Sequence, residues 1–366
     1  MTNKIKHIVI TFVMIATFLS VSLFAWLKPA DDFSLSERRK LSQFPELSFK
    51  TIISGDFMSN FENYTLDQFP LRDKFRTLKA LVARSVFNQS ANNDIYVVDG
   101  FESKIEYPLN EMSVKRAGER FRYVYEKYLK EANTNNYLSI IPDKNYFLAT
   151  ENGYLSTDYD KMISLLRENT RYLEYIDITK DLEISDYYKT DTHWREENIV
   201  DIAEKLGKEM GTDVKAEYQE KTLGVDFYGV YYGQSALPLE AEKIKYLENG
   251  SLKNCRVYDF QNGKEISVYD MEKANGKDPY EMFLGGPLSL VTIENDNAKT
   301  DKELIIFRDS FGSSIAPLLV EGYKKITLVD IRYIHPNLIG NYIEFDSQDV
   351  LFLYSTSVLN NSETIK

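Results

Sequence analysis

Cysteine and histidine are scarce in this chain of 366 residues, and their scarcity excludes several kinds of site. Cys255 is the only cysteine, so neither an intramolecular disulfide nor a cysteine-based metal site can form. The three histidines, His7, His193 and His335, are scattered and include no pair at helical spacing, which argues against a zinc site. The sequence therefore predicts no metal and no cofactor, and any imidazole chemistry must use one of these three side chains.

An excess of positive charge is also missing. The formal net charge is -12, and no basic stripe is present. Proteins that bind nucleic acid neutralise its phosphates with Lys and Arg, so nucleic acid is not an expected partner. By contrast, 43% of the residues are hydrophobic and 13% are aromatic, which is enough to form a large folded core.

The one long hydrophobic run lies near the N-terminus. Residues 8–27 are uncharged and mostly apolar, and a helix of this length, at about 1.5 Å per residue, matches a hydrocarbon core of about 30 Å. Lys4 and Lys6 precede the run, which predicts a cytoplasmic N-terminus and an extracytoplasmic main part. A cleaved signal peptide, which would leave a secreted protein, is the alternative, but the run exceeds the usual apolar region of about 7–15 residues. We therefore predict a membrane anchor over residues 1–30.

Residues 31–93 are predicted to form an N-terminal extension that packs on the main domain. This stretch is polar and aromatic and contains prolines, which favours a linker with short helices. Phe75, Leu78, Leu81, Val82 and Val86 recur at spacings of three and four, the stripe of an amphipathic helix.

Residues 94–366 are predicted to form an α/β domain with a mostly parallel sheet, because strand and helix patterns alternate along them. Strand patterns cover residues 95–98, 137–141, 175–178, 303–307, 325–330 and 350–354. Helix patterns cover residues 114–132, 161–173, 194–210 and 311–320. The less regular stretch at about 211–298 is expected to be a loop-rich insertion, and loops of this kind often carry ligand contacts.

Two short motifs contain the candidate catalytic residues. Asp191 precedes His193 by two residues, and Ser310 lies between a predicted buried strand and the helix after it. A serine at the carboxyl end of a parallel strand faces the crevice where α/β proteins bind ligands, and its own N–H can stabilise an oxyanion. These residue types suggest a nucleophile, its base and the acid that orients the base. The same positions suit helix caps, so the residues alone leave both interpretations open.

A resemblance to a known family bears on this choice. Residues 191–194 read Asp-Thr-His-Trp, which resembles the Asp-His-His-Trp signature of the DHHW family with Thr192 in place of the first histidine. Residues 308–312, Arg-Asp-Ser-Phe-Gly, look like the serine motif of that family. The similarity extends to residues 36–39, 67–72, 141–144, 285–286 and 330–333 and thus covers nearly the whole chain.

The DHHW family is similar to the alginate O-acetyltransferases of the AlgX and AlgJ type. The resemblance implies an SGNH-hydrolase-like three-layer domain with the catalytic order Asp, His, Ser, which makes Ser310 the nucleophile, His193 the general base and Asp191 the residue that orients the imidazole. It also implies a polysaccharide or cell-wall glycan substrate and a membrane-bound O-acyltransferase (MBOAT) partner that exports the acyl group.

Other pocket residues are expected near the proposed triad. Gly285 and Gly286 are candidates for further oxyanion donors, because glycine allows close approach of its backbone. Tyr232, Gln234 and Arg332 are candidates for substrate binding, with core packing or a surface hydrogen bond as the alternative for each.

Three functions follow from these observations. The first is a membrane-anchored O-acetyltransferase of a cell-surface or secreted polysaccharide. The second is a carbohydrate acetylesterase that uses the same triad, because water instead of a sugar hydroxyl can reach an acyl-enzyme. The third is a non-catalytic protein that binds or assembles glycans and keeps the fold.

Overall fold

The computed structural model describes residues 3–366, and the chain forms two compact units. The smaller unit comprises the residues up to Asn93 together with Tyr232–Pro238. The larger unit comprises Asp94–Tyr231 and Leu239–Lys366. The predicted packing of residues 31–93 on the main domain stays a prediction.

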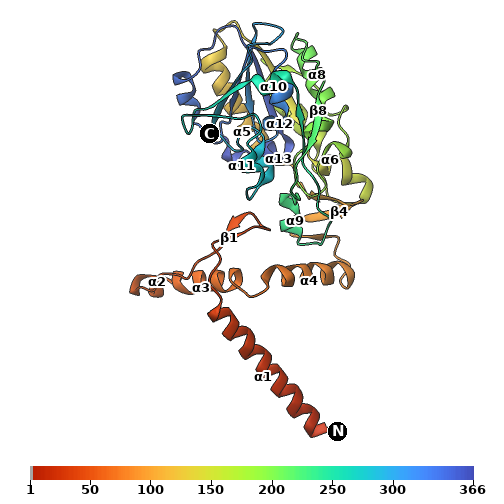
Figure 1. Ribbon diagram of the computed structural model, residues 1–366, viewed down its shortest axis with the longest axis vertical. Coiled ribbons are helices and arrows are strands. Elements are labelled where there is room, and N and C mark those ends of the chain that lie inside the picture. The colour runs from red at the N-terminus through yellow and green to blue at the C-terminus, as the bar shows by residue number, and fades with distance from the viewer. Residues whose placement is uncertain (1–2) are drawn as a thin grey trace. The chain divides into compact units, whose positions relative to one another are not determined.

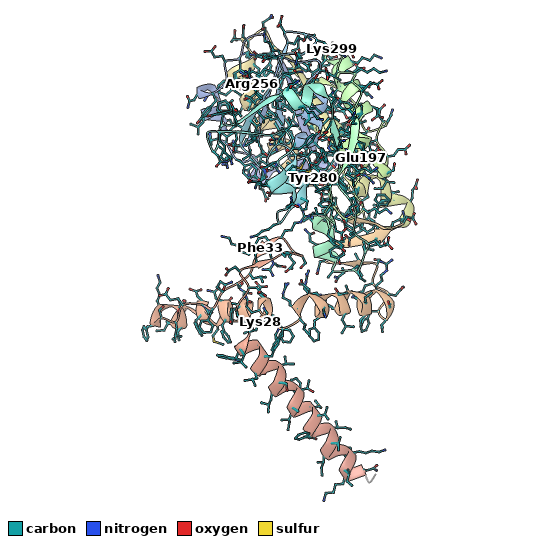
Figure 2. The ribbon with its side chains drawn as sticks, viewed as in Figure 1. Lys28, Phe33, Glu197, Arg256, Tyr280 and Lys299 are labelled. Atoms are coloured by element: carbon teal, nitrogen blue, oxygen red, sulfur yellow. The ribbon has the colours of Figure 1, made fainter. Side chains whose placement is uncertain are left out.

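Helix α1 (Asn3–Leu27) begins the smaller unit (Figures 1 and 2), and none of its residues is buried. Within residues 3–366 it is the one helix that is long and apolar enough to cross a membrane. The predicted N-terminal apolar helix is therefore confirmed. A membrane anchor and a signal sequence share this length and composition.

Residues 28–93 of the smaller unit form short strands and three helices. These elements are β1 (Phe33–Ser34), β2 (Arg39–Lys40), α2 (Phe49–Ser54), α3 (Asp56–Asp67), α4 (Arg72–Ser85) and β3 (Ala91–Asn92). The Arg39 guanidinium holds Asp67 with two hydrogen bonds, of 2.8 and 2.5 Å, and these bonds keep the pKa of the Asp67 carboxyl well below its usual range. Gly233 packs so closely on Ser36 that a Cβ atom there would lie 1.6 Å from the Ser36 carbonyl oxygen.

An eight-stranded sheet forms the centre of the larger unit, in the order β11-β10-β12-β14-β13-β15-β6-β7. Strands β14, β13, β15, β6 and β7 are parallel to one another, whereas β11, β10 and β12 add antiparallel pairs at the other edge. The bounds are β6 (Asn135–Ile141), β7 (Glu174–Tyr175), β10 (Arg256–Asp259), β11 (Lys264–Ile266), β12 (Leu290–Glu294), β13 (Glu303–Arg308), β14 (Lys325–Val329) and β15 (Asp349–Ser355).

Helices cover both faces of this sheet and make a three-layer fold. Side chains of β15 alternate between the two cores: Leu351 and Leu353 face one, and Val350 and Phe352 face the other, as the two-residue period of a strand requires. The first core includes residues of α8 (Val200–Glu209) and α12 (Gly312–Ile315). The second includes residues of α5 (Glu111–Val124), α7 (Tyr159–Asn169) and α13 (Thr356–Asn360).

Shorter elements complete the larger unit. They are β4 (Ile95–Val98) and β5 (Phe101–Lys104), a hairpin; β8 (Gln219–Thr222) and β9 (Lys245–Glu248), an antiparallel pair; and the helices α6 (Lys144–Leu148), α10 (Gly250–Asn254) and α11 (Met271–Ala274). The helix α9 (Val230–Ser235) begins in this unit and ends in the other.

The predicted α/β fold with a mostly parallel sheet is confirmed. Four of the six predicted strands are β6, β13, β14 and β15, neighbours at the centre of the sheet. Residues 95–98 instead form a separate antiparallel hairpin, and only Glu174 and Tyr175 pair as β7. The helix expected from residue 194 begins at Val200, after a short 3-10 turn over Glu196–Asn198.

Glu196 is fully buried beneath this turn, and its carboxylate accepts a hydrogen bond of 2.9 Å from the Leu247 N–H. The Tyr269 hydroxyl lies 3.0 Å from Glu196 Oε2 and 2.6 Å from the Leu247 carbonyl oxygen. Because the tyrosine has one proton and the carbonyl is the nearer acceptor, the tyrosine oxygen can accept a hydrogen bond from a protonated Glu196. Burial raises the pKa of Glu196 well above its ordinary value, which is consistent with a neutral carboxylic acid.

We expect Glu196→Gln to stabilise the protein increasingly as pH rises. A carboxyl whose pKa is raised by folding keeps its proton in the folded state and loses it on unfolding. The free energy of unfolding of the native protein therefore falls as pH rises above the ordinary Glu pKa. Glutamine does not titrate, so the variant does not lose stability in this way. Urea denaturation between about pH 5 and pH 8 should show the variant gaining about 1–3 kcal/mol relative to the native chain. A difference that does not change with pH would contradict a neutral Glu196.

Candidate active site

Ser310 lies in the turn between β13 and α12, at the carboxyl end of the parallel sheet. Asp309 fixes this turn: one carboxylate oxygen accepts from the Phe311 N–H at 3.1 Å, and the other accepts from the N–H of Ser355, at the end of β15, at 2.8 Å. Position 312 has no room for a side chain, because a Cβ atom on Gly312 would lie 2.7 Å from the Arg308 Cβ. The turn is thus tied to the neighbouring strand, and Ser310 remains half-buried.

A continuous hydrogen-bond chain joins Ser310 to the other motif. The Nε2 atom of His193 lies 2.8 Å from Ser310 Oγ, and its Nδ1 atom lies 2.6 Å from Asp191 Oδ2. Asp191 is fully buried, and its second oxygen accepts the Val230 N–H at 2.8 Å. With Nδ1 protonated toward the carboxylate, Nε2 is free to accept the serine proton. The structure brings together all three residues that the sequence nominated for catalysis.

The loop before His193 is closed like a hairpin, with Tyr187 bridged to Trp194 and the Tyr188 N–H bonded to the His193 carbonyl at 3.0 Å. Thr192, which replaces the family's first histidine, accepts a hydrogen bond of 3.2 Å from the Tyr231 hydroxyl. Thr192 therefore contacts Tyr231 and takes no part in the hydrogen bond between Asp191 and His193.

Aromatic packing fixes the imidazole. The ring of Tyr280 stacks on His193 with centroids 3.9 Å apart and an angle of 9° between the planes. Tyr280 in turn hydrogen-bonds Ser314 of α12 at 2.8 Å, and Ser314 Oγ accepts the Trp194 indole N–H, also at 2.8 Å. Burial raises the pKa of Tyr280 well above its ordinary value, so this hydroxyl stays neutral. The serine turn and the histidine loop thus share one buried network.

Lys144, at the start of α6, is a second buried group next to the site. Its Nζ atom donates to the carbonyl oxygens of Tyr188, at 2.9 Å, and Lys189, at 3.0 Å, and lies 4.9 Å from the centre of the Tyr231 ring. Burial lowers the pKa of Lys144 to about 8, although the charge of Asp191 opposes this shift. Lys144 therefore holds the backbone that leads into Asp191.

Sequence reasoning gave no role to Tyr280, Ser314 or Lys144. Tyr280 lies in the irregular stretch after residue 211, where no periodicity indicates which side chains turn inward. Lys144 belongs to the Ile-Pro-Asp-Lys motif at residues 141–144, and a lysine at the carboxyl end of a buried strand is the signal that could have found it.

The remaining candidate residues have other partners. The Gly286 N–H donates to the Phe283 carbonyl at 3.2 Å, so it is already used within its own turn. Gly285 lies in the same turn at φ 72°. Arg332 forms two hydrogen bonds, of 2.9 and 2.7 Å, with the buried carboxylate of Asp330. The roles of these residues in binding substrate stay predictions.

Tyr232 and Gln234 belong to α9 and fall within the smaller unit. The Gln234 carbonyl accepts a hydrogen bond of 2.8 Å from the Asn93 side chain of the same unit. Their part in binding substrate also stays a prediction.

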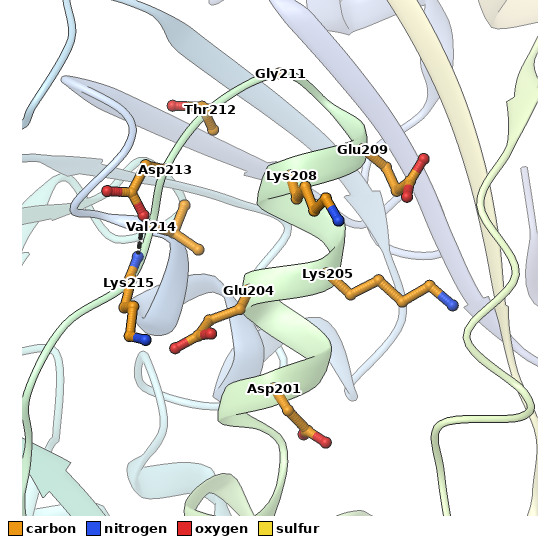
Figure 3. A pocket seen from close by; sticks show the side chains of 10 residues that line it. All are labelled: Asp201, Glu204, Lys205, Lys208, Glu209, Gly211, Thr212, Asp213, Val214 and Lys215. Carbon is orange, nitrogen blue, oxygen red and sulfur yellow. Dashed lines mark hydrogen bonds between the residues drawn. The ribbon is translucent and has the colours of Figure 1, made fainter.

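The described residues include no candidate metal site, and a prominent groove lies away from the triad. Within residues 3–366, no group of three or more His, Cys, Asp and Glu side chains could hold a metal ion. A groove of about 710 Å³ lies between α8 and residues 211–215, lined mainly by charged side chains such as Glu204 and Lys208 (Figure 3). It contains none of the three proposed catalytic residues.

We expect Ser314→Ala to destabilise the larger unit, because the change removes the shared partner of Trp194 and Tyr280 and leaves the buried Tyr280 hydroxyl unpaired. Urea denaturation should show a loss of about 1–3 kcal/mol. Ser313→Ala is the matched control, since Ser313 is also buried in α12 but its hydroxyl makes no hydrogen bond within residues 3–366. Equal losses in the two variants would show that the network does not stabilise the fold.

No protein-family model and no curated protein matches the sequence. Solved structures do match it. A DHHW family protein from Eubacterium siraeum has a TM-score of 0.59 and 22% sequence identity, over 75% of this chain and 95% of that protein. PatB1 of Bacillus cereus has a TM-score of 0.57 and 19% identity, over 74% of this chain and 98% of PatB1.

The O-acetyltransferase domain of Pseudomonas putida AlgJ also aligns, over 73% of this chain and 92% of that domain. Its TM-score of 0.44 and identity of 11% are too low to establish a shared fold. The first two neighbours establish the fold. The chain therefore has the fold of a DHHW family protein and of PatB1, which matches the family that its motifs resemble.

Proposed function

We propose that the protein is a membrane-anchored O-acyltransferase whose larger unit acts outside the cytoplasm on a cell-surface or secreted polysaccharide. The observation that carries this proposal is the hydrogen-bond chain from Ser310 through His193 to Asp191, with distances of 2.8 and 2.6 Å. These distances suit direct proton transfer between nucleophile and base. The apolar helix α1 supports the membrane attachment.

In the first half of the reaction, Ser310 Oγ attacks the carbonyl carbon of an acetyl donor while His193 Nε2 takes its proton. Asp191 keeps the other ring nitrogen protonated and stabilises the imidazolium. The Ser310 N–H, which donates no hydrogen bond within residues 3–366, supports an oxyanion hole at the start of α12. Collapse of the intermediate breaks the bond to the leaving group, which takes the proton from His193 and leaves an acetyl ester on Ser310.

In the second half, a sugar hydroxyl gives its proton to His193 Nε2 and attacks the ester carbonyl. The bond to Ser310 Oγ then breaks, and the serine oxygen recovers the proton. Water in place of the sugar would make the protein an esterase with the same residues. The resemblance to the DHHW family favours transfer, and with it an MBOAT partner that supplies the acyl group.

The test uses the full chain in detergent, with 4-nitrophenyl acetate as donor and glycan oligosaccharides as acceptors. We expect acetylated oligosaccharide in mass spectra, and a fall in its rate of formation of at least about 1,000-fold in Ser310→Ala and His193→Ala. His335→Ala is the control, because within residues 3–366 the imidazole of this exposed histidine forms just one hydrogen bond, accepted from the Asn337 N–H, and its loss should leave the rate unchanged.

Two other outcomes would contradict the proposal. Free acetate without acetylated sugar, lost in Ser310→Ala, would identify an esterase. Equal inactivity of the native chain and Ser310→Ala with all donors and acceptors would identify a non-catalytic protein.

A further inference from the structure

Helix α4 turns its large apolar side chains away from its own unit. Phe75, Leu78 and Val82, at spacings of three and four, are 51%, 55% and 37% exposed, whereas Ala80 and Ala83 are buried. A helix that packs on a soluble core shows the opposite arrangement, with its wide apolar stripe inward. The amphipathic stripe that the sequence predicted is therefore present, but the smaller unit does not cover it.

Exposed apolar side chains are also present on α2. Phe49, Ile52 and Ile53 are between 54% and 80% exposed, and α2, α3 and α4 follow one another in a row that meets the end of α1 (Figure 1). Large apolar side chains that recur on successive helices are too many for an ordinary water-facing surface. They need a covering partner.

The contacts between the end of α1 and α3 indicate what covers these apolar side chains. Gln68, which caps α3, accepts the Asp31 N–H at 2.9 Å and donates to the Asp31 carbonyl at 2.8 Å, just beyond the end of α1 at Leu27. Side chains of α1 and α3, among them Trp26 and Phe61, line one hollow of about 240 Å³. The helices α2–α4 are thus fixed to the end of a helix suited to span a bilayer, at the level where such a helix leaves the hydrocarbon.

Charged residues on α4 agree with this position. Lys74 and Lys79, both exposed, lie four residues before and one residue after Leu78. Lysines beside an apolar stripe can extend their charged ends to lipid headgroups while their stems remain apolar. On the opposite side of α4, Arg76 donates to the Gly233 carbonyl at 2.7 Å and contacts the Glu37 carboxylate at 3.3 Å, so this side faces protein.

We infer that α2, α3 and α4 form an amphipathic platform that lies in the headgroup layer of the membrane that α1 spans, on the side where α1 ends. The exposed face of α4 contacts the boundary between headgroups and acyl chains, as interfacial helices do. This inference rests on the proposed membrane attachment of α1 and is independent of the proposed catalysis.

The test places the full chain in lipid nanodiscs of phosphatidylcholine and phosphatidylglycerol, one copy per disc. An environment-sensitive fluorophore is attached at Leu78→Cys in a Cys255→Ala background. The matched control is Asp73→Cys, since residue 73 is exposed and lies about 140° around α4 from residue 78. We expect spin-labelled lipids to quench the probe at residue 78 several-fold more than the probe at residue 73, and aqueous iodide to show the reverse order.

Two results would overturn the inference. Quenching at residue 78 by iodide and not by labelled lipid would place α4 in water. Protection of residue 78 from both quenchers would show that protein covers the stripe. Val82→Cys on the same stripe must repeat the pattern of Leu78→Cys, and the melting temperature of each variant must match that of the native chain.

Discussion

The hydrogen bond between His193 and Ser310 joins two loops that are 117 residues apart in the chain. Neither loop could hold its side chain in place alone. Ser310 depends on the Asp309 carboxylate, which ties its turn to the end of β15, and His193 depends on Asp191, whose second oxygen is held by the Val230 N–H. The parallel strands bring these loops to one end of the sheet, so the arrangement of the strands determines the site.

The buried surroundings of the site make this arrangement rigid. Trp194 and Tyr280 meet at the Ser314 hydroxyl, and Tyr280 stacks on the imidazole. The hydrogen bonds of Trp194, Tyr280 and Ser314 allow few alternative packings, which suits a site where proton transfer requires distances near 3 Å. Lys144 adds a further constraint by holding two carbonyl oxygens just before Asp191.

Much of the fold could be predicted from the sequence, because buried parallel strands are continuous apolar runs that the chain places between helical patterns. Residues 303–307 and 350–354 are examples, and both became central strands. The three proposed catalytic residues were also nominated, although their pattern alone suited helix caps equally well and the family resemblance separated the two interpretations. Tyr280 was missed because its contact with His193 depends on how an irregular segment folds back, which no local spacing encodes.

The spacing of apolar residues along a helix also does not reveal whether their stripe faces protein, lipid or water. The spacing of Phe75, Leu78 and Val82 is that of a core helix, yet these residues are exposed. An apolar stripe requires cover, and a bilayer provides cover as well as a protein core does. Whether protein or lipid covers the apolar stripe of α4 thus depends on the surroundings of the chain, which its sequence pattern does not encode.

Peptide mapping of the full chain by mass spectrometry, after brief exposure to 4-nitrophenyl acetate, shows whether Ser310 is acetylated and whether this acetylation requires His193. If His193 activates Ser310, we expect one acetyl group on the peptide that contains Ser310, and none on that peptide when His193 is replaced by alanine, because an unassisted serine hydroxyl is a weak nucleophile. Acetylation of Ser310 to the same extent without His193, or an acetyl group only on other residues, would contradict a serine nucleophile activated by His193.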